Sequence, residues 1–212
     1  QRAFTDGVNT FNGADYCNSV YGDNNILVSV GNPIGVFYGY ETKGVFATDA
    51  EAKNAGKEGY LYMLNAAGNK QNFTSGDVHF VDQNGDDCID ERDKVILGNP
   101  NPDFYGNIFA ALNWKNFTLD MGFNFSVGND VYNYQRSILN SGSTFYNQQV
   151  AEVGHWRYEG HEATLPKLAY GDPMGNNRFS DRWIEDGSYL RMKNLRMTYR
   201  IPVPESWTSW LQ

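Results

Sequence analysis

One short acidic segment contains the side chains that could bind a ligand. Between Asp77 and Asp93 the sequence has seven acidic side chains and a single basic one, Arg92, so most of the net charge of −8 is concentrated there. Oxygen donors recur at positions 1, 3, 5, 7, 9 and 12 of a twelve-residue stretch within it, the donor at position 7 being a backbone carbonyl. These residues are Asp82, Asn84, Asp86, Cys88 (through its carbonyl), Asp90 and Asp93.

This spacing is typical of calcium loops of the EF-hand or dockerin type, in which a hard cation neutralises clustered carboxylates. Ile89 would anchor position 8. The sequence departs from the pattern at Asp87, where a glycine normally makes the turn, and at Asp93, where a longer glutamate is usual. Aspartate tolerates a left-handed backbone better than most residues do. The sequence therefore predicts calcium as the cofactor of loop 82–93; the alternative is an acidic, hydrogen-bonded turn without metal.

Patterns for catalysis and for nucleic-acid binding are absent. The sequence has no Gly-x-Ser-x-Gly, no P-loop and no His-Glu-x-x-His motif, and its three histidines are far apart. Carboxylates are plentiful, but nothing selects the facing pair that a glycoside hydrolase needs. With 17 Lys and Arg against 25 Asp and Glu, nucleic acid is not an expected partner. We therefore expect no enzyme activity. The two cysteines, Cys17 and Cys88, are too few for a disulfide framework.

The elements that position this loop are predicted to be strands, because the chain is rich in aromatic residues, Gly and Asn. From residue 107 the hydrophobic pattern has period two, and two runs of about nine to eleven residues flank a tight turn at Lys115-Asn116. One face of the second run is apolar and the other is polar. The apolar residues are Phe117, Leu119, Met121, Phe123 and Phe125. This pattern fits a transmembrane barrel hairpin and equally a hairpin of a soluble β-sandwich.

Alternation returns near the end of the sequence. Leu195, Met197, Tyr199 and Ile201 oppose Asn194, Arg196, Thr198 and Arg200, whereas Leu190 and Met192 are out of phase, which predicts a bulge near Lys193. Arginines on one strand face suit a watery lumen better than a dry core. Elsewhere, a strand is expected at 26–30. A short helix is expected near 49–55, where Thr48 and Glu51 have the spacing of a capping box. Residues 128–188 read as a long loop whose aromatic residues, including Tyr132, Tyr134, Phe145, Tyr146 and Trp156, could stack on sugar rings or peptide.

Several motifs occur in an order that is more informative than any one of them. They are Gly31-Asn-Pro-Ile-Gly-Val-Phe-Tyr-Gly-Tyr40, Gly44-Val-Phe46, Gly76-Asp-Val-His-Phe80 with the acidic loop, Gly98-Asn-Pro-Asn-Pro102, Gly128-Asn-Asp-Val-Tyr-Asn133, and Ser180-Asp-Arg-Trp-Ile-Glu-Asp-Gly-Ser-Tyr-Leu-Arg-Met-Lys-Asn194. From about residue 26 onward the sequence resembles the C-terminal part of SusC/RagA-type TonB-linked (TonB-dependent) outer-membrane transporters of Bacteroidetes.

The resemblance implies an all-β fold, part of a large antiparallel transmembrane β-barrel of 22 strands with long extracellular loops. It implies import of large nutrients, glycans or oligopeptides, across the bacterial outer membrane, with TonB and a SusD-like surface lipoprotein as partners. Leu119, Met121, Phe123 and Phe125 would then face lipid, and Asp120, Asn124, Arg196 and Arg200 would face the lumen.

By the same resemblance the chain divides into five parts. Residues 1–103 would be mostly an extracellular loop region, 104–127 a transmembrane hairpin, 128–188 a second extracellular loop, 189–201 a transmembrane strand, and 202–212 a periplasmic turn with Trp207 and Trp210. The plug domain and last strands would lie outside this sequence. The alternative is a secreted calcium-binding β-sandwich that binds carbohydrate, with the apolar row of 117–125 buried in its core.

Overall fold

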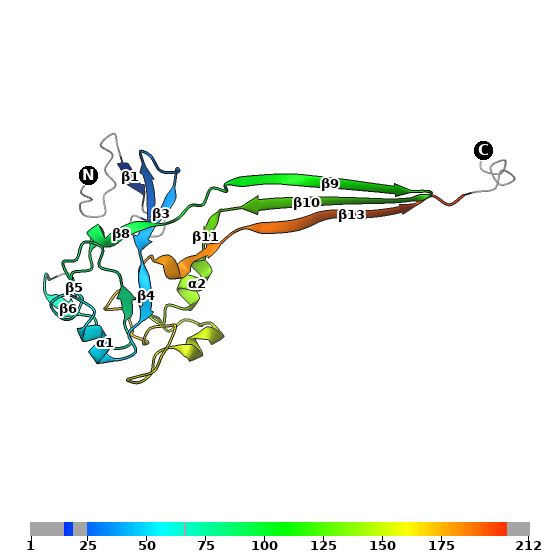
Figure 1. Cartoon of the computed structure of the whole chain (residues 1–212). Helices are drawn as coiled ribbons and strands as arrows, with labels where there is room; N and C mark the ends of the chain where they lie inside the picture. Colours follow the sequence, from blue (N-terminus) through cyan, green and yellow to red (C-terminus); the bar gives the residue numbers. More distant parts are fainter. Residues whose placement is uncertain (1–14, 19–24, 66, 203–212) are drawn as a thin grey trace. The chain divides into compact units, whose positions relative to one another are not determined.

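The computed structural model describes residues 15–18, 25–65 and 67–202. Its regular structure consists mostly of strands, and the chain forms two compact units (Figure 1). The first unit comprises Gln1–Pro100 and Asp130–Glu185, and the second comprises Asn101–Asn129 and Asp186–Gln212. The predicted turn at 202–212, with Trp207 and Trp210, falls outside the described residues from position 203 on. None of the described helices is long and apolar enough to cross a membrane.

The second unit is built on three antiparallel strands of 11 residues each, in the order β13-β10-β9. They are β9 (Phe104–Trp114), β10 (Phe117–Val127) and β13 (Tyr189–Tyr199), the long strands of Figure 1. The sequence predicted the β9–β10 hairpin and its two-residue turn, in which Lys115 takes a left-handed backbone with φ of 53°. β13 ends at Tyr199 rather than at Ile201, because β10 begins at Phe117 and Arg200 can pair only with the turn, through the carbonyl of Asn116 (2.7 Å).

The register of these strands gives the sheet one apolar face and one polar face. Opposite residues share a face, and residues alternate between faces along each strand. The apolar row of β10 therefore lies beside Leu112 and Ile108 of β9 and beside Met197, Leu195, Met192 and Leu190 of β13. The other face carries Asn107, Ala111 and Asn113 on β9, Thr118, Asp120, Asn124 and Ser126 on β10, and Arg191, Asn194, Arg196 and Thr198 on β13.

Phe109 is the exception to the alternation, because it is an aromatic residue on the polar face. It pairs with Gly122, and a Cβ atom at Gly122 would lie 3.1 Å from the Phe109 ring. The ring thus occupies the space that a side chain at position 122 would fill. On the apolar face Phe125 covers Gly106 in the same way, with 3.0 Å to a hypothetical Cβ atom. Each glycine is therefore matched by an aromatic ring on the neighbouring strand.

The predicted bulge is present in β13. Gly122 pairs with Asn194 and Phe123 pairs with Met192, so Lys193 is the extra residue that has no partner on β10. A bulge moves the side chains that follow it by one position in register. Leu190 and Met192 thereby join the same apolar face as Leu195 and Met197, although they are out of phase with them in the sequence.

The first unit contains short strands and little continuous sheet. Its largest sheet has the order β1-β2-β3-β8, formed by β1 (Asp15–Asn18), β2 (Ile26–Ser29), β3 (Val36–Tyr40) and β8 (Lys94–Gly98). Two-stranded ladders join β4 (Thr42–Val45) to β7 (Val78–Phe80), β5 (Tyr62–Leu64) to β6 (Lys70–Asn72), and β11 (Asp130–Tyr132) to β12 (Ile184–Asp186). The 128–188 segment also holds α2 (Tyr134–Leu139) and the 3-10 helices η2 (Val150–Gly154) and η3 (Asp181–Trp183).

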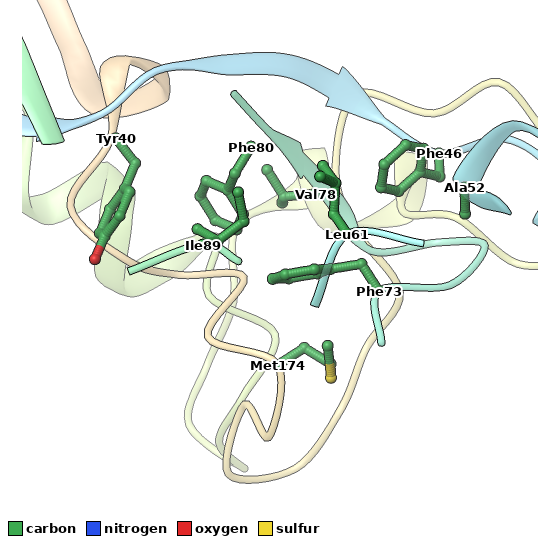
Figure 2. Close-up of a cluster of buried hydrophobic side chains, with 9 residues drawn as sticks. All are labelled: Tyr40, Phe46, Ala52, Leu61, Phe73, Val78, Phe80, Ile89 and Met174. Atoms are coloured by element: carbon green, nitrogen blue, oxygen red, sulfur yellow. The ribbon is translucent and has the colours of Figure 1, made fainter. Parts of the chain in front are cut away.

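The predicted short helix is α1 (Asp49–Lys53). The Thr48 hydroxyl accepts from the Glu51 amide (3.2 Å), and the Glu51 carboxylate accepts from the Ala47 amide (2.9 Å). Ala52 of this helix is buried in the main hydrophobic core. Figure 2 shows that the core gathers side chains from segments far apart in the sequence: Tyr40, Phe46, Ala52, Leu61, Phe73, Val78, Phe80, Ile89 and Met174.

A buried carboxylate joins this core to the 128–188 segment. Asp77 is fully buried, and its Oδ2 accepts hydrogen bonds from the Thr74 amide (3.0 Å) and Lys167 Nζ (3.0 Å). Its Oδ1 accepts from Asn176 Nδ2 (2.9 Å), and Asn176 Oδ1 in turn accepts from the Val78 amide (2.8 Å). A buried charge is tolerated only when it is paired and hydrogen-bonded. Asp77 meets both conditions and therefore fixes two distant segments against β7.

We predict that Asp77→Ala loosens the first unit. The substitution leaves Asn176 Nδ2 without its acceptor and leaves Lys167 with only the Thr74 hydroxyl and the Ser75 carbonyl as acceptors. Removing one partner of a buried ion pair costs about 3 kcal/mol. Limited proteolysis of the folded protein should therefore cut residues 67–100 and 160–180 faster in the variant. The matched control is Glu162→Ala, which removes an exposed carboxylate from the same segment. Equal cleavage rates in the two variants would contradict this role of Asp77.

Candidate functional site

The acidic loop 82–93 connects β7 to β8 and ends in the 3-10 helix η1 (Glu91–Asp93). Its fold follows from side-chain oxygens that accept backbone amides. Asp82 accepts from the amides of Gly85 (2.6 Å) and Asp87 (2.8 Å). Asn84 and Asp86 each accept from the amide two residues further on, at 2.9 Å. Such Asx turns close a loop without secondary structure.

Asp93, the predicted ligand at position 12, closes the loop. Its carboxylate is fully buried and accepts from the amides of Gln83 (3.0 Å) and Asp90 (2.8 Å), so it ties the end of the loop to its beginning. Asp90 and Asp93 form a capping box around η1. Burial raises the pKa of Asp93 above its ordinary value. Asp93, whose side chain is shorter than the usual glutamate, therefore holds the two ends of the loop together.

Arg92 is not a predicted ligand, but its side chain binds two of the predicted ligands. Its Nη2 lies 2.6 Å from Asp86 Oδ2 and 2.7 Å from Asp90 Oδ2, so its guanidinium bridges the predicted ligands at positions 5 and 9. Both ion pairs are substantially exposed, and such pairs contribute little stability on their own. Their effect is on charge, because one cation within the loop neutralises part of the acidic cluster.

Asp87 explains the departure at position 6. Its φ of 62° is left-handed, as the turn of a calcium loop requires, and its carboxylate accepts from the amides of Lys57 (2.6 Å) and Glu58 (2.9 Å). The hydrogen bond from Lys57 and then that from Glu58 lower the pKa of Asp87. Aspartate thus makes the turn that glycine usually makes and also attaches the acidic loop to the 56–58 turn.

The middle of the loop is anchored in the core, as the sequence predicted for Ile89. Ile89 is buried, its amide donates to the Tyr62 carbonyl (2.8 Å), and the Tyr62 amide donates to the Asp87 carbonyl (2.9 Å). Cys88 is a buried free thiol whose pKa is raised by burial. The side chain of Cys17 is not among those described.

The six predicted calcium ligands all lie in this loop. Across residues 15–18, 25–65 and 67–202, no group of three or more His, Cys, Asp or Glu side chains is gathered in a way that could hold a metal ion. The carboxylates bind backbone amides and Arg92 instead. Calcium binding stays a prediction, and it would require Arg92 to leave Asp86 and Asp90.

The aromatic residues singled out in the 128–188 segment separate into two groups. Tyr132 packs against Phe179 and Tyr134, and Trp156 donates to the Ala47 carbonyl (3.1 Å), so these rings mainly hold the fold together. Phe145 and Tyr146 are exposed instead, and Phe145 stacks on Tyr170 with ring centroids 4.9 Å apart. The alternation in the sequence gave no sign that residues 145 and 170 meet.

No protein-family profile matches the chain, but several curated proteins are similar to it in sequence. It is 32% identical over 176 residues to TonB-dependent receptor P3 and 29% identical over 184 residues to TonB-dependent receptor P26, both of Formosa agariphila. These matches cover 83% and 86% of this chain. A third match, 29% identical over 57% of this chain, is TonB-dependent receptor SusC of Bacteroides thetaiotaomicron.

A solved structure has the same fold. The RagAB peptide transporter matches with a TM-score of 0.64 over 89% of this chain at 19% sequence identity. The chain spans 16% and 17% of the lengths of the two Formosa receptors and 18% of the matched RagAB chain, so it corresponds to a part of each. TonB-dependent receptors of the SusC and RagA type are proteins of the bacterial outer membrane.

We predict that Asp87→Gly frees the 56–58 turn without unfolding the loop. Glycine keeps the left-handed turn at position 87, but the amides of Lys57 and Glu58 lose their acceptor. Their hydrogen exchange, measured by mass spectrometry or NMR, should accelerate by about tenfold, because both amides lose a hydrogen bond to a charged group. In the natural chain, the contribution of Asp87 is present above its ordinary pKa of 3.8 and is lost as the pH falls through its lower folded-state pKa. Unchanged exchange at both amides would contradict this role.

Proposed function

Because this chain is homologous to TonB-dependent receptors of the SusC/RagA type, we propose that β9, β10 and β13 form part of the membrane-spanning barrel of an outer-membrane nutrient importer. The observation that carries the proposal is the two-faced sheet of the second unit. Strands of 11 residues have the length needed to cross an outer membrane at a tilt. In such a barrel the apolar face contacts lipid and the polar face lines the interior.

The polar face supports this orientation. It carries Asp120 directly opposite Arg196, and Arg191 lies opposite Asn124. Charged side chains are expensive in a dry core, but a hydrated barrel interior solvates them. The predicted lumen residue Arg200 lies one position beyond the end of β13 and therefore belongs to the turn end of the sheet.

The β-sandwich alternative requires the apolar row to be buried under a second sheet. The row on β10 is only partly buried, and the apolar residues beside it on β9 and β13 are exposed: Ile108 is 55% exposed, Leu112 is 59% exposed and Met197 is 67% exposed. An exposed apolar surface of this extent is typical of an interaction or membrane surface and not of a soluble domain. The exposure therefore favours the barrel over the secreted carbohydrate-binding sandwich.

The proposed function is that of a whole receptor, and this chain spans less than a fifth of the lengths of the receptors that it matches. We propose that the receptor imports large nutrients, glycans or oligopeptides, without chemical conversion, and that TonB supplies energy. A SusD-like lipoprotein would cover the external opening. The two-residue turn at Lys115-Asn116 suits the periplasmic side, where barrel turns are short, and the long segments 1–103 and 128–188 suit the external side.

A matched pair of substitutions tests the orientation of the sheet. Ala110 and Ala111 are neighbours on β9 at the same depth and face opposite sides, Ala110 opposite Met121 and Ala111 opposite Asp120. Arginine on the lipid face near the bilayer midplane costs about 2–4 kcal/mol, whereas lumen positions tolerate it. We predict that Ala110→Arg sharply reduces folded receptor in the outer membrane, measured by heat-modifiable gel mobility, while Ala111→Arg preserves it. Equal losses, or the reverse order, would contradict the proposed barrel orientation.

Import itself is tested in cells that produce the full receptor. Uptake of a fluorescently labelled polysaccharide or peptide mixture should require both the receptor and TonB. Deletion of either should reduce uptake to the background of cells without the receptor. Uptake that continues unchanged without TonB would contradict the proposed function.

We also propose that loop 82–93 binds calcium and thereby stiffens an external segment. The left-handed turn at Asp87, the buried Ile89 and the spacing of the carboxylates support this proposal. Calcium and Arg92 compete for Asp86 and Asp90 in this scheme. The cation that neutralises the loop would then depend on the calcium concentration outside the cell.

The competition gives the calcium proposal a sharp test. Arg92→Ala should strengthen calcium binding by about tenfold, because the carboxylates lose their internal cation. Asp82→Ala combined with Asp86→Ala should abolish binding and increase protease cleavage of the loop in calcium buffer. Calorimetry with calcium and cleavage with and without a chelator provide the two measurements. Indifference to the chelator and to all three substitutions would overturn the metal assignment.

A further inference from the structure

Two loops of the first unit enclose a shallow hollow of about 390 Å³. One loop contributes residues 142–146 and 148, and the other contributes residues 168–170. The Gly171 amide donates to the Ser143 carbonyl (2.9 Å), so a backbone hydrogen bond holds the loops together. Gly142 and Gly171 have left-handed φ values of 58° and 76°, at which a larger residue would be strained.

The aromatic rings of the hollow face solvent. Phe145 is 91% exposed and Tyr170 is 75% exposed, although the two rings stack at an interplanar angle of 26°. Tyr146 beside them is also exposed. Single exposed apolar residues are ordinary, but three exposed aromatic rings on one hollow are typical of a binding surface. Because Phe145 and Tyr170 stack face to face, each ring holds the other in place, and the outer ring face of the pair forms an aromatic platform before any ligand arrives.

The chemistry of the lining selects the ligand. Every lining residue is uncharged, and the polar groups are the hydroxyls of Ser143, Thr144, Tyr146 and Tyr170 and the amide of Gln148. Gln148 Nε2 donates to the Thr144 carbonyl (3.5 Å), which leaves its amide oxygen to accept from a ligand. Neutral donors and acceptors around an aromatic platform match a ligand with an apolar face and a rim of hydroxyls. Charged peptides and acidic polysaccharides would find no counter-charge in this lining.

We propose that this hollow is a subsite for a neutral sugar ring, which stacks on the Phe145–Tyr170 platform and hydrogen-bonds to Gln148 and the neighbouring hydroxyls. The inference rests on the proposed importer function and narrows its substrate to neutral glycans. The hollow captures one segment of the polymer on the receptor. It performs no chemistry, and its contribution is to affinity at the stage before import.

Calorimetry on the full receptor in detergent tests the subsite. The probes are a panel of neutral hexasaccharides (maltohexaose, cellohexaose, laminarihexaose, mannohexaose and xylohexaose), with hexagalacturonate and a neutral hexapeptide for comparison. We expect at least one neutral hexasaccharide to bind. Phe145→Ala and Tyr170→Ala should each weaken that binding by about tenfold or more, the loss typical of truncating a central aromatic contact.

Control variants separate stacking from folding. Tyr170→Phe keeps the platform and should retain most of the affinity. Val150→Ala truncates an exposed apolar side chain outside the hollow and should leave affinity unchanged. All variants should show the heat-modifiable mobility of the folded receptor, which distinguishes loss of the subsite from loss of the protein.

Three results would overturn the subsite. One is failure of every neutral hexasaccharide to bind the natural receptor below 1 mM. Another is equal binding by the natural receptor and both alanine variants. The third is weaker retention of a lipoprotein partner in Phe145→Ala with unchanged sugar binding, which would identify the hollow as a protein contact. TonB-dependent uptake of the labelled polysaccharide or peptide mixture would persist in each case if the importer function alone is right, so the two failures are distinguishable.

Discussion

The hydrogen-bonded register of β10 against its two neighbours is the constraint on which the proposed membrane role depends. Because side chains alternate between faces, a slip of one residue would move the whole apolar row onto the polar face. The two-residue turn at Lys115-Asn116 fixes the register on the β9 side, and the bulge at Lys193 fixes it on the β13 side. Backbone amides in hydrocarbon must also find partners on adjacent strands. Among the described strands, β9 and β13 pair only with β10 in this sheet, so a barrel requires further strands beside them.

The first unit has short strands that bury only a modest apolar core, so it needs other interactions to hold its long segments together. Carboxylates compensate by accepting backbone amides at fixed points. Asp93 closes the acidic loop, Asp87 attaches it to the 56–58 turn, and Asp77 joins β7 to residues 167 and 176. Such bonds to charged groups are stronger than those between neutral groups. They allow a long polar segment to keep a defined shape, which a loop needs if it is to present an aromatic hollow.

Much of the local structure was predictable from sequence, because its causes lie within a few residues. The capping box of α1, the hairpin around Lys115-Asn116 and the phase change near Lys193 follow from spacing alone, whereas the bounds 104–127 of the hairpin came from the family resemblance. What could not be predicted depends on contacts between distant residues. Asp87 binds amides 29 and 30 residues away, and Asp77 binds Lys167 across 90 residues. The position of the Phe109 ring on the polar face is explained only by its pairing with Gly122. The bridging role of Arg92 depends on side-chain geometry that the ligand pattern does not encode.

The most direct test of the central claim measures what surrounds each residue of β10. Single spin labels at positions 118–126 of the full receptor in bilayers would report collisions with oxygen, which is concentrated in lipid, and with a water-soluble nickel chelate. The barrel predicts high oxygen accessibility at 119, 121, 123 and 125 and high nickel accessibility at 118, 120, 124 and 126, with a period of two. High nickel accessibility at all positions, or low accessibility to both reagents along the apolar row, would contradict it.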